Sequence, residues 1–138
     1  MTRGAHLNTR LLLTLASALL CSTIARAEDL TGLWATDGSK CNQIFSKAGA
    51  SFTFAKDSDI HGSGFIIDGR RIVTQMAECD IKTTKQDGAI THLILGCATD
   101  VMLSSVQASF KMAGNDRIIR VFPGVSDMEI PYERCSLK

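Results

Sequence analysis

Cysteine and histidine are the residue types of this chain that could carry redox, metal or nucleophilic chemistry. Four of the five cysteines lie beyond the first quarter of the sequence, at Cys41, Cys79, Cys97 and Cys135. Their spacings are long and include no C-x-x-C pair, which argues against zinc. An even number of cysteines in a small exported domain is typical of two disulfides, with three connectivities open. We expect disulfide chemistry here, with neither a metal nor a cofactor.

The histidines do not form a recognisable catalytic set. His61 follows Asp57-Ser58-Asp59-Ile60, which contains the residue types of a Ser-His-Asp triad, but no G-x-S-x-G or H-E-x-x-H motif is present. A polar loop that enters a glycine-rich strand is the simpler interpretation. His92 alternates with Leu93 and is expected on the outer face of a strand. Because no nucleophile–base pair is visible, the sequence predicts a binding protein, not an enzyme, and assigns no catalytic residue.

The first 27 residues have the features of a signal peptide. Arg3 and Arg10 precede an apolar run over 11–20, and Ala25-Arg26-Ala27 offers small residues at a cleavage site. The apolar run is shorter than the roughly 20 residues that a membrane-spanning helix needs. We therefore predict cleavage after Ala27, no stable membrane insertion, and a periplasmic or secreted protein.

A lipoprotein is the alternative to simple cleavage. Cys21 could be lipidated, but Leu20 stands where a lipoprotein signal normally has a small residue. The site after Ala27 is therefore favoured.

The mature chain, residues 28–138, is predicted to be one domain. It has twelve basic and fourteen acidic residues, a net charge of −2. This balance gives no basic patch for nucleic acid, and it permits a basic protein partner without requiring one.

Short strands separated by turn residues dominate the mature chain. Residues 104–112 show the clearest alternation of apolar and polar side chains, as a half-buried strand requires. About eight such strands predict a single antiparallel up-and-down β-barrel. Closure removes exposed sheet edges, and a monomer is expected. The strand-like segments are 30–36, 41–45 (a strand or a helical turn, with strand favoured), 51–56, 60–67, 70–79, 80–86, 90–97, 104–112, 117–122 and 132–135.

Two Asp-Gly pairs, at 68–69 and 87–88, predict hairpins. A two-residue loop at the first pair places Phe65 opposite Ile72. At the second pair, a three-residue loop or one bulge places Cys79 opposite Cys97. Directly opposed cysteines on antiparallel strands fall within the roughly 4.4–6.8 Å between Cα atoms that a disulfide needs.

The ends of the chain are predicted to meet. Gly32 and Trp34 lie in the first strand, where Trp34 is expected to plug one end of the barrel. The last strand must pair with the first if the sheet closes. Cys41, just after the first strand, is therefore predicted to bond Cys135 in the last one.

The Gly-x-Trp motif at 32–34, followed by Cys41, resembles that of the lipocalin-like small barrels. It looks most like the bacterial periplasmic metalloprotease inhibitors of that superfamily. The resemblance implies an eight-stranded barrel that inhibits an enzyme by inserting its N-terminal tail into the cleft, where the amino terminus approaches the zinc.

We therefore predict an inhibitor-type binding protein that acts on a secreted or host hydrolase through its loops or N-terminal tail. The alternative is a carrier of a small apolar ligand in the barrel lumen. The interior distinguishes the two, because a lumen filled by side chains leaves no room for a ligand. The expected filling residues are Phe52, Phe54, Phe65, Phe110 and Met112.

Overall fold

A computed structural model describes Met1 and residues 29–125 and 128–137 of the chain. The predicted signal peptide, its cleavage after Ala27 and the alternative lipidation of Cys21 lie outside the described residues.

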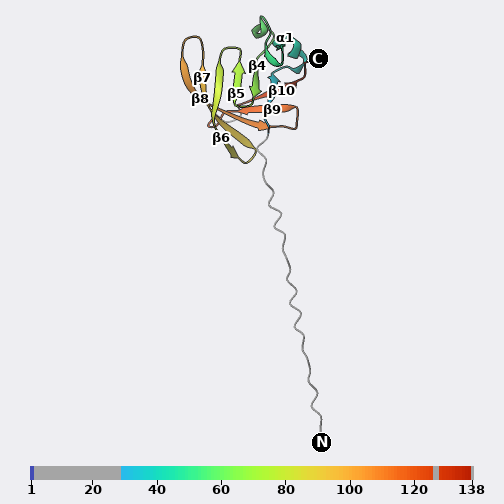
Figure 1. Cartoon of the computed structure of the whole chain (residues 1–138), viewed down its shortest axis with the longest axis vertical. Helices are drawn as coiled ribbons and strands as arrows, with labels where there is room; N and C mark the ends of the chain where they lie inside the picture. The colour runs from blue at the N-terminus through green and yellow to red at the C-terminus, as the bar shows by residue number, and fades with distance from the viewer. Residues whose placement is uncertain (2–28, 126–127, 138) are drawn as a thin grey trace.

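Eight strands form a closed antiparallel barrel in the order β1-β10-β9-β8-β7-β6-β5-β4 (Figure 1). The segment of chain that connects β1 to β4 contains a separate two-stranded sheet, β2-β3. The predicted all-β up-and-down barrel and the pairing of its last strand with its first are confirmed. The elements are β1 (Gly32–Ala35), η1 (Gly38–Lys40), α1 (Cys41–Ile44), β2 (Phe45–Ala48), β3 (Ser51–Phe54), η2 (Ser58–Ile60), β4 (Gly64–Asp68), β5 (Arg71–Thr74), β6 (Glu78–Asp87), β7 (Ile90–Ala98), β8 (Leu103–Met112), β9 (Arg117–Val121) and β10 (Glu129–Cys135).

Aromatic and aliphatic side chains fill the barrel lumen. The Phe65 ring lies 5.4 Å from the Phe110 ring and 4.8 Å from the Tyr132 ring, centroid to centroid. Trp34 is fully buried in the same cluster, and Met112 packs against it. Strand alternation supplies this core, because one face of each strand points inward.

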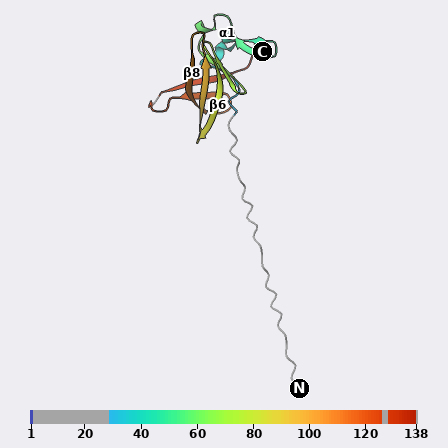
Figure 2. The same cartoon turned by 60° about the vertical axis from the view of Figure 1, so that its left-hand side comes forward.

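A second core lies outside the barrel, where α1 and its neighbours cover β1 and β4. Cys41, Ile44 and Phe45 pack there against Leu33 and Ile66, whose side chains point away from the lumen. Figure 2 shows α1 to one side of the long strands β6 and β8.

The strand expected at 41–45 is therefore wrong. Cys41 and Ile44 are buried while Asn42 and Gln43 are exposed, a spacing that a helical turn satisfies and an alternating strand does not. A strand begins only at Phe45.

Phe52 and Phe54 do not fill the lumen, contrary to expectation. Both lie on β3, outside the barrel. Phe54 packs against Phe45, with ring centroids 5.3 Å apart, and Phe52 is 42 % exposed. Their alternation predicted a strand correctly, but only Phe54 is partly buried, and the alternation could not show which sheet the strand joins.

Both predicted Asp-Gly hairpins form with the turn moved by one residue. Asp68 pairs with Arg71, so Phe65 lies opposite Thr74 instead of Ile72. Asp87 likewise pairs with Ile90. In each turn only the glycine has positive φ, 57° at Gly69 and at Gly88. A type I′ turn needs positive φ at both central residues, whereas a type II′ turn needs it at the first alone. Both turns therefore have the φ signs of type II′.

Candidate functional site

Trp34 and Arg134 close one end of the barrel, here called the plug end. The Trp34 indole N–H donates a hydrogen bond to the Leu30 carbonyl oxygen at 2.9 Å. The Arg134 guanidinium lies 4.2 Å from the Trp34 ring and donates to the carbonyl oxygens of Thr31 (2.6 Å) and Asn115 (2.9 Å). A cation over an indole face that also donates two hydrogen bonds to carbonyl oxygens is a stable arrangement.

Gly32 belongs to the same arrangement. Its φ is +151°, and a Cβ placed there would come within 2.5 Å of the Arg134 Nη1 atom. The predicted structural role of Gly32 and Trp34 therefore has a specific cause, the close approach of Arg134. No motif indicates this partner, which lies near the other end of the sequence, on β10.

Both predicted disulfides are present. Cys41 bonds Cys135, with 5.5 Å between Cα atoms, and ties the outer core to β10. Cys79 bonds Cys97 across β6 and β7, with 4.0 Å between Cα atoms. All four described cysteines are thus used structurally, in bonds that persist in oxidising compartments.

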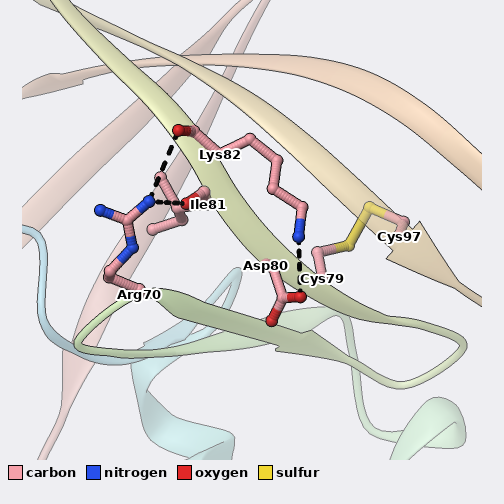
Figure 3. A network of polar contacts seen from close by, with 6 residues as sticks. All are labelled: Arg70, Cys79, Asp80, Ile81, Lys82 and Cys97. Carbon is pink, nitrogen blue, oxygen red and sulfur yellow. Dashed lines mark hydrogen bonds and ion pairs between the residues drawn. A yellow bond between two sulfur atoms is a disulfide. The ribbon is translucent and has the colours of Figure 1, made fainter.

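A β-bulge at Lys82 sets the register of the second bridge. Above the bulge Cys79 pairs with Cys97, and below it the pairing shifts by one residue. The predicted opposition of the two cysteines is confirmed, through a bulge and not a three-residue loop. The Arg70 guanidinium donates to the carbonyl oxygens of Ile81 (2.7 Å) and Lys82 (3.4 Å), which lie at the bulge (Figure 3). Arg70, although exposed, thus contacts the irregular backbone.

Replacement of Arg70 by alanine is expected to lower the free energy of unfolding by about 1 kcal/mol, because two bulge carbonyl groups lose a charged donor at an exposed site. Urea unfolding with the disulfides intact measures this. Arg71→Ala is the matched control: it removes an exposed ion pair to Glu78 and should change stability by less than about 0.5 kcal/mol. Equal effects would show that Arg70 has no special role.

The structure places His61 and His92 apart. His61 ends the η2 turn, and His92 lies on β7 with its Nδ1 atom 2.7 Å from the Ser109 hydroxyl oxygen. The His92–Ser109 contact depends on the β7–β8 register and was not predicted. Ser109 is buried, so its hydroxyl is not presented to a substrate.

A shallow cleft of about 690 Å³ lies on the outer face of β7 and β8 beside the β9–β10 loop. His92 and the ion pair between Lys111 and Glu129, at 2.5 Å, provide its charged and titratable side. Phe122 and Met128 contribute apolar surface. Asp87 also lines the cleft, so its carboxyl side chains outnumber its single lysine.

Arg120 is a partly buried charged residue. It pairs across the sheet with Phe110 and Ile130, so its side chain shares their inward face. The guanidinium lies 4.9 Å from the Phe122 ring. Its buried Nε atom has no hydrogen-bond partner within the described part of the chain.

The carboxyl groups with perturbed acidity have local structural roles. Hydrogen bonds from the Ser39 side chain and backbone lower the pKa of Asp37, which caps η1. Hydrogen bonds from Thr31 lower the pKa of Asp29 at the plug end. Ionised carboxylates accept such bonds, so neither group is poised for proton transfer near neutral pH.

Apolar side chains are exposed on neighbouring loops at the end opposite the plug. We call Ile60, Met76, Val101 and Met102 the apolar rim; their exposed fractions are 74, 84, 90 and 58 %. Glu78 pairs with Ala98, which places the β5–β6 and β7–β8 loops side by side (Figure 1). The Gln75 amide donates to the Gly62 carbonyl oxygen at 2.9 Å and joins the η2 segment to them.

The lumen offers little space to a ligand. A cavity at the plug end, lined in part by Leu30, Ile81 and Leu93, has a volume of about 160 Å³. Sites for drug-sized ligands measure roughly 300–1,000 Å³. Side chains occupy the interior instead.

Two further features bear on the class of protein. Residues 29–125 and 128–137 bring together no group of three or more His, Cys, Asp or Glu side chains that could hold a metal ion. Within the same residues, no helix has the length and apolar character to cross a membrane.

The fold and its bonds define a small, closed β-barrel with two disulfides. Comparison with protein-family models, with curated proteins and with solved structures finds no match to this chain. The small-barrel part of the predicted resemblance is confirmed by the structure, and the kinship with metalloprotease inhibitors stays a prediction.

Proposed function

We propose that this protein is a periplasmic or secreted binding protein of the inhibitor type, which docks on another protein through the apolar rim. The observation that carries this proposal is the clustering of large apolar side chains on three adjoining loops. Contiguous exposed apolar surface on a small protein is typical of an interaction site. The disulfides support an oxidising compartment.

The loops are favoured over the N-terminal tail as the docking element. Leu30 is buried in the lumen core, and the Thr31 N–H donates to the Asp29 carboxylate at 2.9 Å. If cleavage follows Ala27, only Glu28 precedes these anchored residues. A tail this short would not reach into an enzyme cleft.

The carrier alternative receives less support. The interior is occupied by Trp34, Phe65, Phe110 and Tyr132, and the cavity that reaches the lumen residues Leu30 and Leu93 measures only about 160 Å³. A carrier would need a lumen that admits its ligand. The apolar surface of this barrel lies on its loops instead.

The variant Val101→Asp is expected to weaken binding of the partner about tenfold or more, since a charge would enter an apolar contact at its centre. Immobilised protein would first retain partners from periplasm and culture supernatant. The affinity of a retained hydrolase, and its inhibition by the purified barrel, would then be measured.

Val125→Asp is the matched control, because Val125 is also exposed, at 54 %, but lies on the β9–β10 loop outside the rim. Both variants should keep the stability of the wild type to within about 0.5 kcal/mol. Equal binding by wild type and Val101→Asp would remove the rim from the proposal. A retained hydrolase that keeps full activity when saturated would contradict inhibition.

A further inference from the structure

Strand β8 has an edge that the barrel leaves open. It pairs with β7 from Leu103 to Lys111, but β9 joins its other side only from Ser109 onward. In the part of the chain that the structure describes, no strand pairs with 103–108 on that side. We call residues 103–108 the β8 edge.

The hydrogen-bond pattern shows which backbone groups are free along this edge. The Thr99 N–H donates to the Met102 carbonyl oxygen at 2.9 Å next to the β7–β8 loop, and the Ala113 N–H donates to the Arg117 carbonyl oxygen at 2.9 Å next to the β8–β9 turn. Hydrogen-bonded pairs alternate along an antiparallel ladder. Counting from either end of β8 identifies the same residues on the edge whose N–H and C=O groups point away from β7, namely Leu103, Ser105 and Gln107.

The β8 edge lacks the charges, prolines and bulges that protect sheet edges. It reads Leu-Ser-Ser-Val-Gln-Ala, without charge or proline, and Leu103 is 84 % exposed. Natural proteins place charges, prolines or bulges where an unpaired edge would otherwise attract another strand.

Strands β6 and β10 also extend beyond a neighbouring strand, and both have features that protect the unpaired part. Beyond its pairing with β5, β6 has Lys82, Lys85 and the bulge whose carbonyl groups Arg70 covers. Before its pairing with β1, β10 has Glu129 and Pro131. The contrast makes β8 the exposed strand that is suited to pairing.

We propose that the β8 edge binds the same edge of a second copy of this chain, antiparallel, about a two-fold axis at Ser105. Ser105 then lies opposite Ser105 of the second copy, and Leu103 lies opposite Gln107. At this register every free N–H on the edge faces a free C=O, because the same alternation holds in both copies.

A second copy is the occupant that the edge itself specifies. The paired segments are uncharged, so self-association brings no like charges together, while a charged partner strand would find no counter-charge. The sequence led us to expect a monomer, and the proposed dimer departs from that expectation because the β8 edge stays unpaired in the closed sheet. The paired segment is short, so the dimer should dissociate on dilution.

Ser105→Pro tests the proposal, because it removes an N–H group that the β7–β8 ladder does not use. Proline is tolerated at such edge positions. Sedimentation velocity from low to high micromolar protein should show a wild-type dimer. The variant should have a dissociation constant at least about tenfold higher, since the symmetric bonds at Ser105 are lost.

Ser105→Thr, which keeps the N–H, is the control and should dimerise like the wild type. Gln107→Lys is a second test that leaves the backbone unchanged: two added charges at the paired edges should also favour the monomer. It decides the matter if far-UV circular dichroism shows that Ser105→Pro does not fold.

A wild-type protein that stays monomeric at every concentration would overturn the proposal. So would a dimer that both Ser105→Pro and Gln107→Lys leave intact, since its interface would lie elsewhere. A monomer whose hydrolase binding is weakened by Ser105→Pro would assign the edge to that partner and would equally refute self-association.

Discussion

Replacement of Trp34 by alanine is expected to lower the free energy of unfolding by about 3–5 kcal/mol. The side chain has no exposed surface, and its removal would leave a cavity between the lumen core and the plug end. It would also leave the Arg134 guanidinium without the ring it covers. Urea unfolding should be followed by far-UV circular dichroism. Trp34 is the only tryptophan of the chain, so the variant has no tryptophan fluorescence to report unfolding.

Trp34→Phe separates the contributions within this effect. Phenylalanine keeps an aromatic ring but cannot donate to the Leu30 carbonyl oxygen, so a smaller loss of about 1–2 kcal/mol is expected. A loss below about 1 kcal/mol for Trp34→Ala would contradict a buried plug. It would instead indicate an exposed residue available for binding.

The Trp34 site shows which parts of the structure can be predicted from the sequence and which cannot. Gly-x-Trp near the start of a strand predicted a buried indole, because Gly32 lets the chain cross the barrel end and a tryptophan has the largest apolar surface to bury. It did not predict Arg134, since the partner is chosen by the register between β1 and β10, where Trp34 pairs with Arg134. Register between strands a hundred residues apart depends on closure of the whole barrel.

Alternation predicted burial well where a strand has neighbours on both sides and poorly where it does not. On β8, Phe110, which has β9 beside it, is buried as expected, but Val106, on the same face, is 36 % exposed. Residue 106 lies beyond the end of β9, which pairs with β8 only from Ser109 onward. The same fact produces the open β8 edge, so the failed burial prediction and the proposed interface have one cause.

The candidate docking surface was not predictable residue by residue. Met76 and Val101 are unremarkable in the sequence, because single exposed apolar residues are common on protein surfaces. They become a site only when the strand order places the β5–β6 and β7–β8 loops together at one end. The sequence did predict that loops would matter, since it offered no catalytic set and an interior rich in large side chains.

Loss of the Cys41–Cys135 bridge is expected to destabilise the domain more than loss of the Cys79–Cys97 bridge. The first spans 94 residues of sequence and the second spans 18. In the chain-entropy model, closing loops of these lengths stabilises the folded state by about 4.7 and about 3.2 kcal/mol respectively, as upper values. The second bridge also joins strands that a continuous ladder already holds.

The double variants Cys41→Ala/Cys135→Ala and Cys79→Ala/Cys97→Ala compare the bridges without leaving a free thiol. All four cysteines are buried to a similar extent, so the loss of packing is matched and the difference reports the bridges. Urea unfolding should show the first variant to be the less stable by about 1–2 kcal/mol. The opposite order would mean that the hairpin bridge, by fixing the β6–β7 register at the bulge, contributes more than its short loop implies. Peptide mapping without reduction checks the premise, because a fragment joining Cys41 to Cys79 or Cys97 would refute both the connectivity and the closure of the barrel by β1 and β10.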